Sequence, residues 1–160
     1  VLDLGGLINT NFENLLRTHE LKTGRLIQTS LLAGAWAAKS CKSSILSIAT
    51  IKEQMRLGSH IGIIFQLLDD LSELAEDLSS HEREVNPFLR FPDESIERLS
   101  LGVAEIKKIQ GSHVSAVLAD YFKKMKQLIE QDLQSKKSKI IPQITEERTL
   151  ESVKDFVGTL

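Results

Sequence analysis

Apolar residues recur at helical spacing along two long stretches of the chain that contain no proline. In the first stretch, from about Phe12 to Ala38, they roughly follow the spacing of one face of an α-helix. A second stretch with the same spacing runs from about Ser44 to Leu78. The polar segment Lys39–Ser44 between them is predicted to be a turn. Because short turns join antiparallel neighbours, we expect the two helices to pack antiparallel.

The second half of the chain has a similar pattern, interrupted once by a polar, proline-containing segment. Residues Ser79–Pro92 are predicted to be a loop, because two prolines punctuate a polar stretch. A third helix is expected after Asp93, a fourth over about Ser112–Gln134, and a short last helix from near Thr145. No stretch shows the alternation that is typical of a strand. The predicted fold class is therefore all-α.

Two glycines on the second predicted helix are expected to mark a close helix contact. Gly58 and Gly62 lie four residues apart and therefore share one face of that helix. Glycine in a helix interior costs about 1 kcal/mol relative to alanine. A close approach by a neighbouring helix would explain why two glycines occur here despite this loss of stability.

Composition favours an ordinary globular enzyme or binding domain over a nucleic-acid or membrane protein. The chain has 160 residues, of which 41% are hydrophobic and 26% charged, and this suits a single domain spanning residues 1–160. A formal net charge of -2 gives no strong field toward nucleic acid. No apolar run approaches the roughly 18 residues that a transmembrane helix needs. The single cysteine, Cys41, allows no internal disulfide and favours a cytoplasmic location.

Three carboxylates gather near the end of the second predicted helix. Asp69 and Asp70 directly follow two leucines, and Glu73 lies four and three residues further on, so all three share one side of the helix. Like charges at this spacing repel each other, and no cationic side chain lies within the next turn. A hard divalent cation would relieve the repulsion, and Mg²⁺ prefers one or two carboxylates together with phosphate oxygens and water. On spacing alone, a solvated acidic face remains the alternative.

Two motifs resemble those of a known enzyme family. The segment 65–73, Phe-Gln-Leu-Leu-Asp-Asp-Leu-Ser-Glu, resembles the second aspartate-rich motif, F-Q-x-x-D-D-x-x-D, of the trans-prenyl diphosphate synthases. Upstream, Lys22-Thr23-Gly24 followed by Leu26 resembles the K-T-G/A-x-L motif of that family. Residues 33–35, Ala-Gly-Ala, resemble the glycine–alanine pair that usually follows. The resemblance covers roughly residues 1–90.

This resemblance implies a fold, a reaction and a cofactor. The fold is an isoprenoid-synthase-like bundle of antiparallel helices around a deep cavity. The reaction transfers prenyl groups between isoprenoid diphosphates. Mg²⁺ helps the allylic diphosphate to ionise, and the double bond of isopentenyl diphosphate attacks the carbocation. By the same resemblance the protein is expected to form a homodimer, with a heteromer as the alternative.

The resemblance also assigns a role to each matched residue. Asp69, Asp70 and Glu73 are expected to bind Mg²⁺. Lys22 would contact the diphosphate as a point charge. Thr23 would lie beside the cavity and stabilise the carbocation, and Gln66 would form a hydrogen bond near the diphosphate.

Three departures from the family pattern qualify these assignments. The third acid of the motif is Glu73 where the family has aspartate. The lysine-bearing loop that ends in K-x-T-x-P is shorter here, and its nearest match begins at Arg83, which would bind diphosphate through a bidentate fork. The first aspartate-rich motif of the family is absent, since Asp69-Asp70 is the only Asp-Asp pair. In the family, the first aspartate-rich motif precedes a segment that residues 2–4 of this chain resemble. Because the chain also begins with Val1 instead of methionine, we expect it to be the C-terminal half of the enzyme, and a poor catalyst alone.

The sequence allows two alternative functions. Squalene and phytoene synthases share the fold, couple two prenyl diphosphates head to head, and carry an E-D pair and R-x-Y-x-P where this chain has Glu76-Asp77 and residues 83–87. They usually carry asparagine at the position of Asp69, so the chain-elongating synthases match better. A diphosphate-binding subunit of a heteromeric synthase, with weakened activity, is the second alternative.

Overall fold

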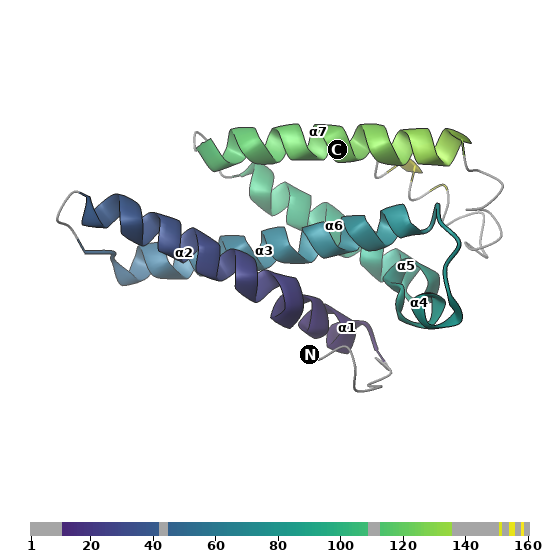
Figure 1. Ribbon diagram of the computed structural model, residues 1–160, viewed down its shortest axis with the longest axis horizontal. Helices are drawn as coiled ribbons and strands as arrows, with labels where there is room; N and C mark the ends of the chain where they lie inside the picture. The colour runs from purple at the N-terminus through teal and green to yellow at the C-terminus, as the bar shows by residue number, and fades with distance from the viewer. Residues whose placement is uncertain are drawn as a thin grey trace.

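Every regular element in the described part of the chain is a helix. A computed structural model describes residues 11–41, 45–108 and 113–135, together with positions 151, 154, 155 and 158. Within these residues the helices pack side by side as a bundle (Figure 1). The predicted all-α class is thereby confirmed. The short helix expected from Thr145 begins outside the described residues.

The first predicted helix is present, but it contains a turn of a different type. Helix α1 (Phe12–His19), the π-helical turn η2 (Glu20–Gly24) and helix α2 (Arg25–Ser40) follow one another without a break. The side chain of Asn11 caps the start of α1 by accepting a hydrogen bond from the Asn14 N–H at 2.9 Å. The pattern of apolar residues predicted the helix and gave no sign of the π-turn.

The second predicted helix is shorter than expected at both ends. Helix α3 spans Ile48–Glu73, where the sequence pattern predicted Ser44 to Leu78. It begins late because Ser47 has an extended backbone and caps the first turn with its hydroxyl group. It ends early because the N–H of Leu74 bonds back only three residues, which tightens the chain out of the α-helix.

The predicted loop over residues 79–92 is wrong, because two short helices occupy it. Helix α4 (Ser80–Val85) starts with a capping box made by Ser79 and the glutamate three residues later. Helix α5 (Pro87–Arg90) starts with the side chain of Asn86 as its cap and a proline at its first position. Among the residues that suggested a loop, Ser79 and Asn86 are helix caps and Pro87 begins a helix.

The last two described helices agree with the pattern. Helix α6 (Pro92–Lys107) begins within two residues of the start predicted for the third helix. Helix α7 (His113–Ser135) begins and ends within two residues of the bounds predicted for the fourth helix. In the described part, no helix combines the length and the apolar character that crossing a membrane requires.

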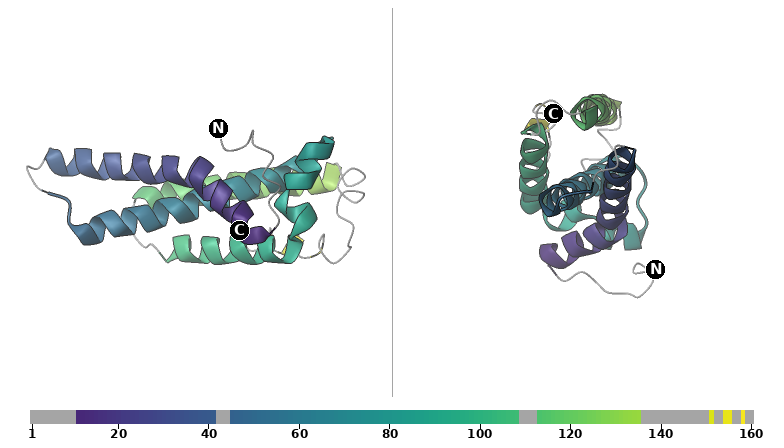
Figure 2. Two further views of the ribbon diagram at one scale, coloured as in Figure 1. Left: turned by 90° about the horizontal axis from the view of Figure 1, so that it is seen from below. Right: turned by 90° about the vertical axis from the view of Figure 1, so that its left-hand side faces the viewer.

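Helices α2 and α3 form an antiparallel pair held together by close backbone contact. Figure 2 shows them extending together to the same end of the molecule. Gly62 faces Gly24, and Gly58 faces Gln28, so the residue numbers run in opposite directions along the contact. A Cβ added at Gly62 would lie 2.4 Å from the Cα of Gly24, and one added at Gly58 would lie 2.6 Å from the Cα of Gln28. The antiparallel packing and the predicted role of the two glycines are confirmed.

Helix α3 lies at the centre of the hydrophobic core. It packs against α2, α6 and α7, and its leucines Leu67 and Leu68 are completely buried. Leu99 of α6, Phe122 of α7 and Phe88 of α5 belong to the same cluster. The core therefore fixes the direction of α3 and the position of its last turns, which carry the acidic residues.

Candidate functional site

The face of α3 that contacts α2 through glycine continues into the polar residues of the candidate site. Gly58, Gly62, Gln66 and Asp70 follow at intervals of four residues, and therefore lie along one side of the helix. Over the first two of these positions the backbones of α2 and α3 touch. Toward the end of α3 the helix α1 diverges from it (Figure 1). Polar side chains therefore occupy this face in place of glycine.

The K-T-G segment lies in the π-turn, directly against this face. Residues 22–24 are the last three of η2. Gly24 makes the close contact with Gly62, and the hydroxyl of Thr23 donates a hydrogen bond to Oε1 of Gln66 at 3.1 Å. Single π-turns within α-helices are frequent at functional sites. Here the turn brings the K-T-G segment into contact with the glutamine of the aspartate-rich segment.

Asp70 is the most enclosed of the three acids. Nε2 of Gln66 donates to its Oδ1 at 3.3 Å, so Gln66 links Thr23 to Asp70. Its other oxygen, Oδ2, is buried, accepts no hydrogen bond, and lies 3.6 Å from Nε2 of His19. His19 belongs to the last turn of α1, and neither the composition nor the motifs of the sequence pointed to it.

The main chain of the acidic turn is held by a residue from outside the helix. The carbonyl of Asp70 is one of the last four in α3, which lack a partner within the helix. Nδ2 of Asn86 donates to this carbonyl at 2.8 Å, while Oδ1 of Asn86 accepts from the N–H of Phe88 at 3.0 Å. Asn86 is 2% exposed. The residue thus fixes the end of α3 and the start of α5 together, a role that sequence reasoning missed.

Burial and mutual repulsion disfavour the charged forms of two of the acids. Burial, and next the charge of Glu73, raises the pKa of Asp70 to about 7. Burial, and next the charge of Asp69, raises the pKa of Glu73. The charge of Lys22 opposes both shifts, which places Lys22 within electrostatic range of Asp70 and Glu73. Any positive charge added nearby would therefore stabilise the ionised forms of these carboxylates.

Asp69 is exposed and lies on the side of α3 toward α7. The ring of Tyr121, on α7, packs against that of Phe65 with 4.2 Å between the ring centroids. Burial, reinforced by the charge of Asp69, raises the pKa of Tyr121 to about 12. Asp69 and Asp70 therefore face different neighbours, although they are adjacent in the sequence.

The donor atoms of these residues suit a divalent cation whose ligand shell is completed by other ligands. Within the described residues, no three His, Cys, Asp or Glu side chains converge as a ready metal cluster. The donors nevertheless suit Mg²⁺, because they are carboxylate oxygens and because Oδ2 of Asp70 is buried without a hydrogen bond. A cation that also takes phosphate oxygens and water needs only part of its ligand shell from the protein.

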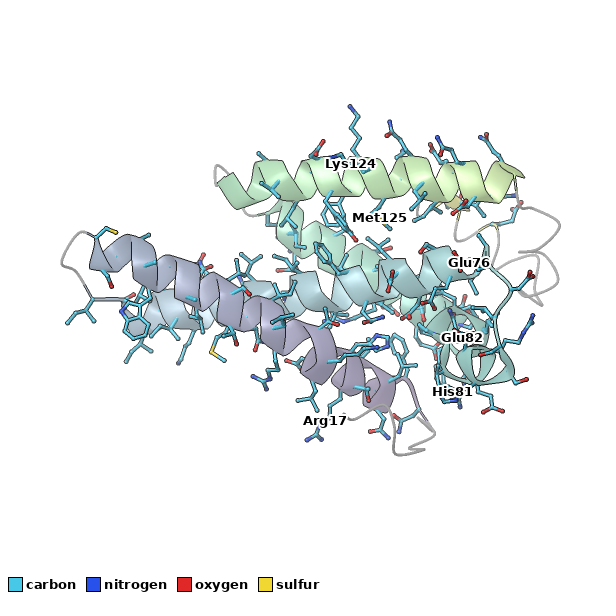
Figure 3. All side chains as sticks on the ribbon, viewed as in Figure 1. Arg17, Glu76, His81, Glu82, Lys124 and Met125 are labelled. Atoms are coloured by element: carbon cyan, nitrogen blue, oxygen red, sulfur yellow. The ribbon has the colours of Figure 1, made fainter. Side chains whose placement is uncertain are left out.

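Arg83 lies on α4, on the far side of the turn that follows α3. Its side chain is exposed, and its Nε donates to the carbonyl of Leu78 at 3.2 Å. The neighbouring Glu82 contributes to the raised pKa of Glu73, so α4 lies at the same end of the molecule as the acids. Figure 3 shows Glu76 and Glu82 at this end. The structure thus brings Arg83 to this end of the molecule without giving it a contact to the acids.

A groove of about 790 Å³ lies elsewhere, between α1, α3 and α6. Arg17, Glu20 and Arg98 are among the residues that line it, and Figure 3 labels Arg17 on α1. Neither Lys22 nor any of the three acids lines this groove. The candidate site is therefore defined by the Thr23–Gln66–Asp70 hydrogen bonds and not by this groove.

Comparison with known proteins assigns more than half of the chain to a family. A family model described as polyprenyl synthetase matches residues 1–86 of the chain. No curated protein and no solved structure matches it. The matched range is more than half of the chain, and it includes His19, the π-turn, all of α3 and Asn86.

Proposed function

The chain belongs to the polyprenyl synthetase family, and we propose that the protein joins an allylic diphosphate to isopentenyl diphosphate in a magnesium-dependent reaction. Membership of the family indicates prenyl transfer in general. The observation that carries the finer proposal is the hydrogen-bonded chain from Thr23 through Gln66 to Asp70. It joins the K-T-G turn to the acidic turn, and a diphosphate ester with its metal ions needs both cationic and carboxylate partners in one place.

Each residue has a defined task in this proposal. Asp69, Asp70 and Glu73 hold the magnesium ions through carboxylate oxygens. Bound magnesium supplies positive charge that stabilises the departing diphosphate. Lys22 binds a diphosphate oxygen, and support for this comes from its electrostatic reach to Asp70 and Glu73.

The oxygen of Thr23 lies beside the carbon that becomes a cation, and Gln66 forms a hydrogen bond near the diphosphate. When the carbon–oxygen bond breaks, its electron pair leaves with the diphosphate. The double bond of isopentenyl diphosphate then supplies two electrons to the new carbon–carbon bond, and the released diphosphate takes up the proton whose loss restores a double bond. Oxygen dipoles that are already oriented stabilise the developing positive charge at no reorganisation cost during the reaction. The 3.1 Å hydrogen bond between these two side chains supports such an orientation.

Arg83 is proposed to bind the diphosphate from α4. Support comes from its position one residue after Glu82, whose charge acts on Glu73. A guanidinium group can bind two phosphate oxygens at once, which a lysine cannot. In Arg83→Lys, diphosphate affinity is therefore expected to fall, although the charge is kept.

We also propose that the protein works as a homodimer in the cytoplasm. Leu26 and Trp36, both on α2, are each 68% exposed, and Ile45 and Ile48 beside its end are 94% and 72% exposed. Large apolar side chains at this exposure favour association with another chain. Sedimentation of the full-length protein at micromolar concentration tests the assembly, and a monomer or a complex with a different subunit contradicts it.

The function is tested by product analysis with the full-length protein. Allylic diphosphate and labelled isopentenyl diphosphate are supplied with Mg²⁺, and the products are separated by chain length. The expected product carries the label and is longer by one or more five-carbon units, and chelation of the metal abolishes it. Lys22→Gln should lower the rate, whereas Lys52→Gln, which removes an exposed charge from the opposite end of α3, should not.

Two outcomes would contradict this proposal and favour an alternative. A product made from two allylic diphosphates without isopentenyl diphosphate would indicate head-to-head condensation. Magnesium-dependent binding of diphosphate with no product would indicate a binding subunit that has lost turnover.

A further inference from the structure

The structure places His19, the last residue of α1, against an acid of the candidate site. Its side chain and that of Asp70 are each 12% exposed, and 3.6 Å separates Nε2 of His19 from Oδ2 of Asp70. The two residues come from different helices and are far apart in the sequence. A polar pair that is buried between two helices restricts how either side chain can turn.

Three contacts surround Asp70, and each restrains a different part of it. Asn86 binds its main-chain carbonyl, and Gln66 binds Oδ1. Oδ2 accepts no hydrogen bond, and His19 is the residue that faces it. The backbone and one oxygen are therefore fixed by hydrogen bonds, while the direction of the second oxygen depends on the imidazole.

We propose, on the basis of the proposed function, that His19 is a positioning residue for metal binding, which holds the Asp70 carboxyl group in the orientation that meets a divalent cation. At 3.6 Å the pair lies beyond hydrogen-bond distance. Hydrogen bonds in active sites are often long before substrate binds, and they shorten in the complex. The residue acts through Asp70, so it needs no contact with the metal or with the substrate.

Substitution of His19 is expected to lower metal affinity by an amount that depends on the side chain that replaces it. Side chains that orient a metal ligand typically change metal affinity by about 10- to 100-fold when they are removed. In His19→Asn the amide is too short to place a donor where Nε2 lies, whereas the longer amide in His19→Gln reaches that position. Affinity should therefore fall at least tenfold in His19→Asn and His19→Leu, and stay close to wild type in His19→Gln.

Mn²⁺ binding by the full-length protein, with inorganic pyrophosphate present, tests this pattern without any measurement of turnover. Because pyrophosphate itself binds Mn²⁺, electron paramagnetic resonance of free Mn²⁺ is compared with a protein-free solution of the same pyrophosphate concentration, and the difference gives the dissociation constant for each variant. His81→Asn is the matched control, because His81 is exposed on α4, and it should bind as wild type does. Circular dichroism melts without metal show whether each variant folds. If His19→Leu does not fold, metal affinity is compared between the His19→Asn and His19→Gln variants.

The outcomes separate this inference from the function on which it rests. If wild-type protein binds Mn²⁺ but His19→Asn binds it equally well, the role of His19 is refuted and the proposed function stands. If wild-type protein binds no Mn²⁺ with pyrophosphate, the proposed function itself fails, and the role of His19 fails with it.

Discussion

The hydroxyl of Thr23 donates a hydrogen bond to the side chain of Gln66 at 3.1 Å, although 43 residues separate them in the sequence. Gln66 donates in turn to Asp70, so one polar network joins the π-turn to the acidic end of α3. This network lies where η2 and α3 approach closely, beside the contact between Gly24 and Gly62. The packing of two helices thus sets the geometry of the site.

Gly62→Ala should destabilise the protein by about 3 kcal/mol, at the upper end of the range for overpacking. Its new Cβ would lie 2.4 Å from the Cα and 2.8 Å from the N of Gly24, and backbone atoms cannot move aside as the end of a side chain can. Urea unfolding followed by circular dichroism measures the change.

Gly34→Ala is the matched control for this prediction. Gly34 is also helical, but a Cβ there would meet no atom within 4 Å. Alanine should therefore stabilise the protein by up to about 1 kcal/mol through helix propensity. Equal effects of the two substitutions would show that the contact between α2 and α3 is not as close as described.

Asn86→Ala should cost about 2–3 kcal/mol of unfolding free energy, because it leaves a carbonyl and an N–H without their partners at a buried position. Chemical denaturation provides the measurement. Asn11→Ala removes one exposed helix cap and should cost about 1 kcal/mol. The account of Asn86 is wrong if its substitution proves no more costly than that of Asn11.

The stability of the metal-free protein should fall as the pH rises from about 4 to about 7. The pKa of Asp70 is raised to about 7 from an ordinary value of 3.8. Between these values the folded state keeps a proton that the unfolded state has lost, so raising the pH favours unfolding. A shift of this size corresponds to a loss of a few kcal/mol, on the order of 1.4 kcal/mol per pKa unit.

Asp70→Asn isolates this effect, because asparagine cannot ionise. Unfolding free energies of both proteins at pH 5 and pH 8, with chelator present, provide the comparison. The loss between the two pH values should be smaller in the variant, and a residual slope in the same direction is expected from Glu73, whose pKa is also raised. A stability difference between the two proteins that does not change with pH would contradict the burial of Asp70.

The long helices and the two glycines could be predicted because they follow local rules. Apolar spacing of three and four residues marks a helix wherever its partner lies, and two glycines one turn apart mark a close contact. The ends of α3 were misplaced because a single serine cap and a tightened last turn decide them. Helices α4 and α5 were missed because Ser79 and Asn86 occur equally in loops and in helix caps.

The candidate site was predictable only where its residues belong to motifs. The sequence pointed to Lys22, Thr23, Gln66 and the three acids, and the structure links Thr23, Gln66 and Asp70 through hydrogen bonds. His19 gave no signal, because a lone histidine has meaning only through its neighbours in space. The π-turn gave none either, since helix propensity does not distinguish a single π-turn from the α-helix on either side of it.

The most direct test of the central claim is to measure stability and turnover together in Asp69→Asn. Asp69 is exposed, and its charge raises the pKa of both Asp70 and Glu73, so removing it should stabilise the metal-free protein by a few tenths of a kcal/mol. The same charge is proposed to hold magnesium against the leaving group, and its loss should slow prenyl transfer by roughly a hundredfold or more. Glu53→Gln, at another exposed position of α3, serves as the control and should leave the rate unchanged. We expect Asp69→Asn to melt at or above the wild-type temperature without metal and to lose turnover with Mg²⁺. A variant that melts lower and keeps its turnover would show that the acids are structural, and would contradict the proposed function.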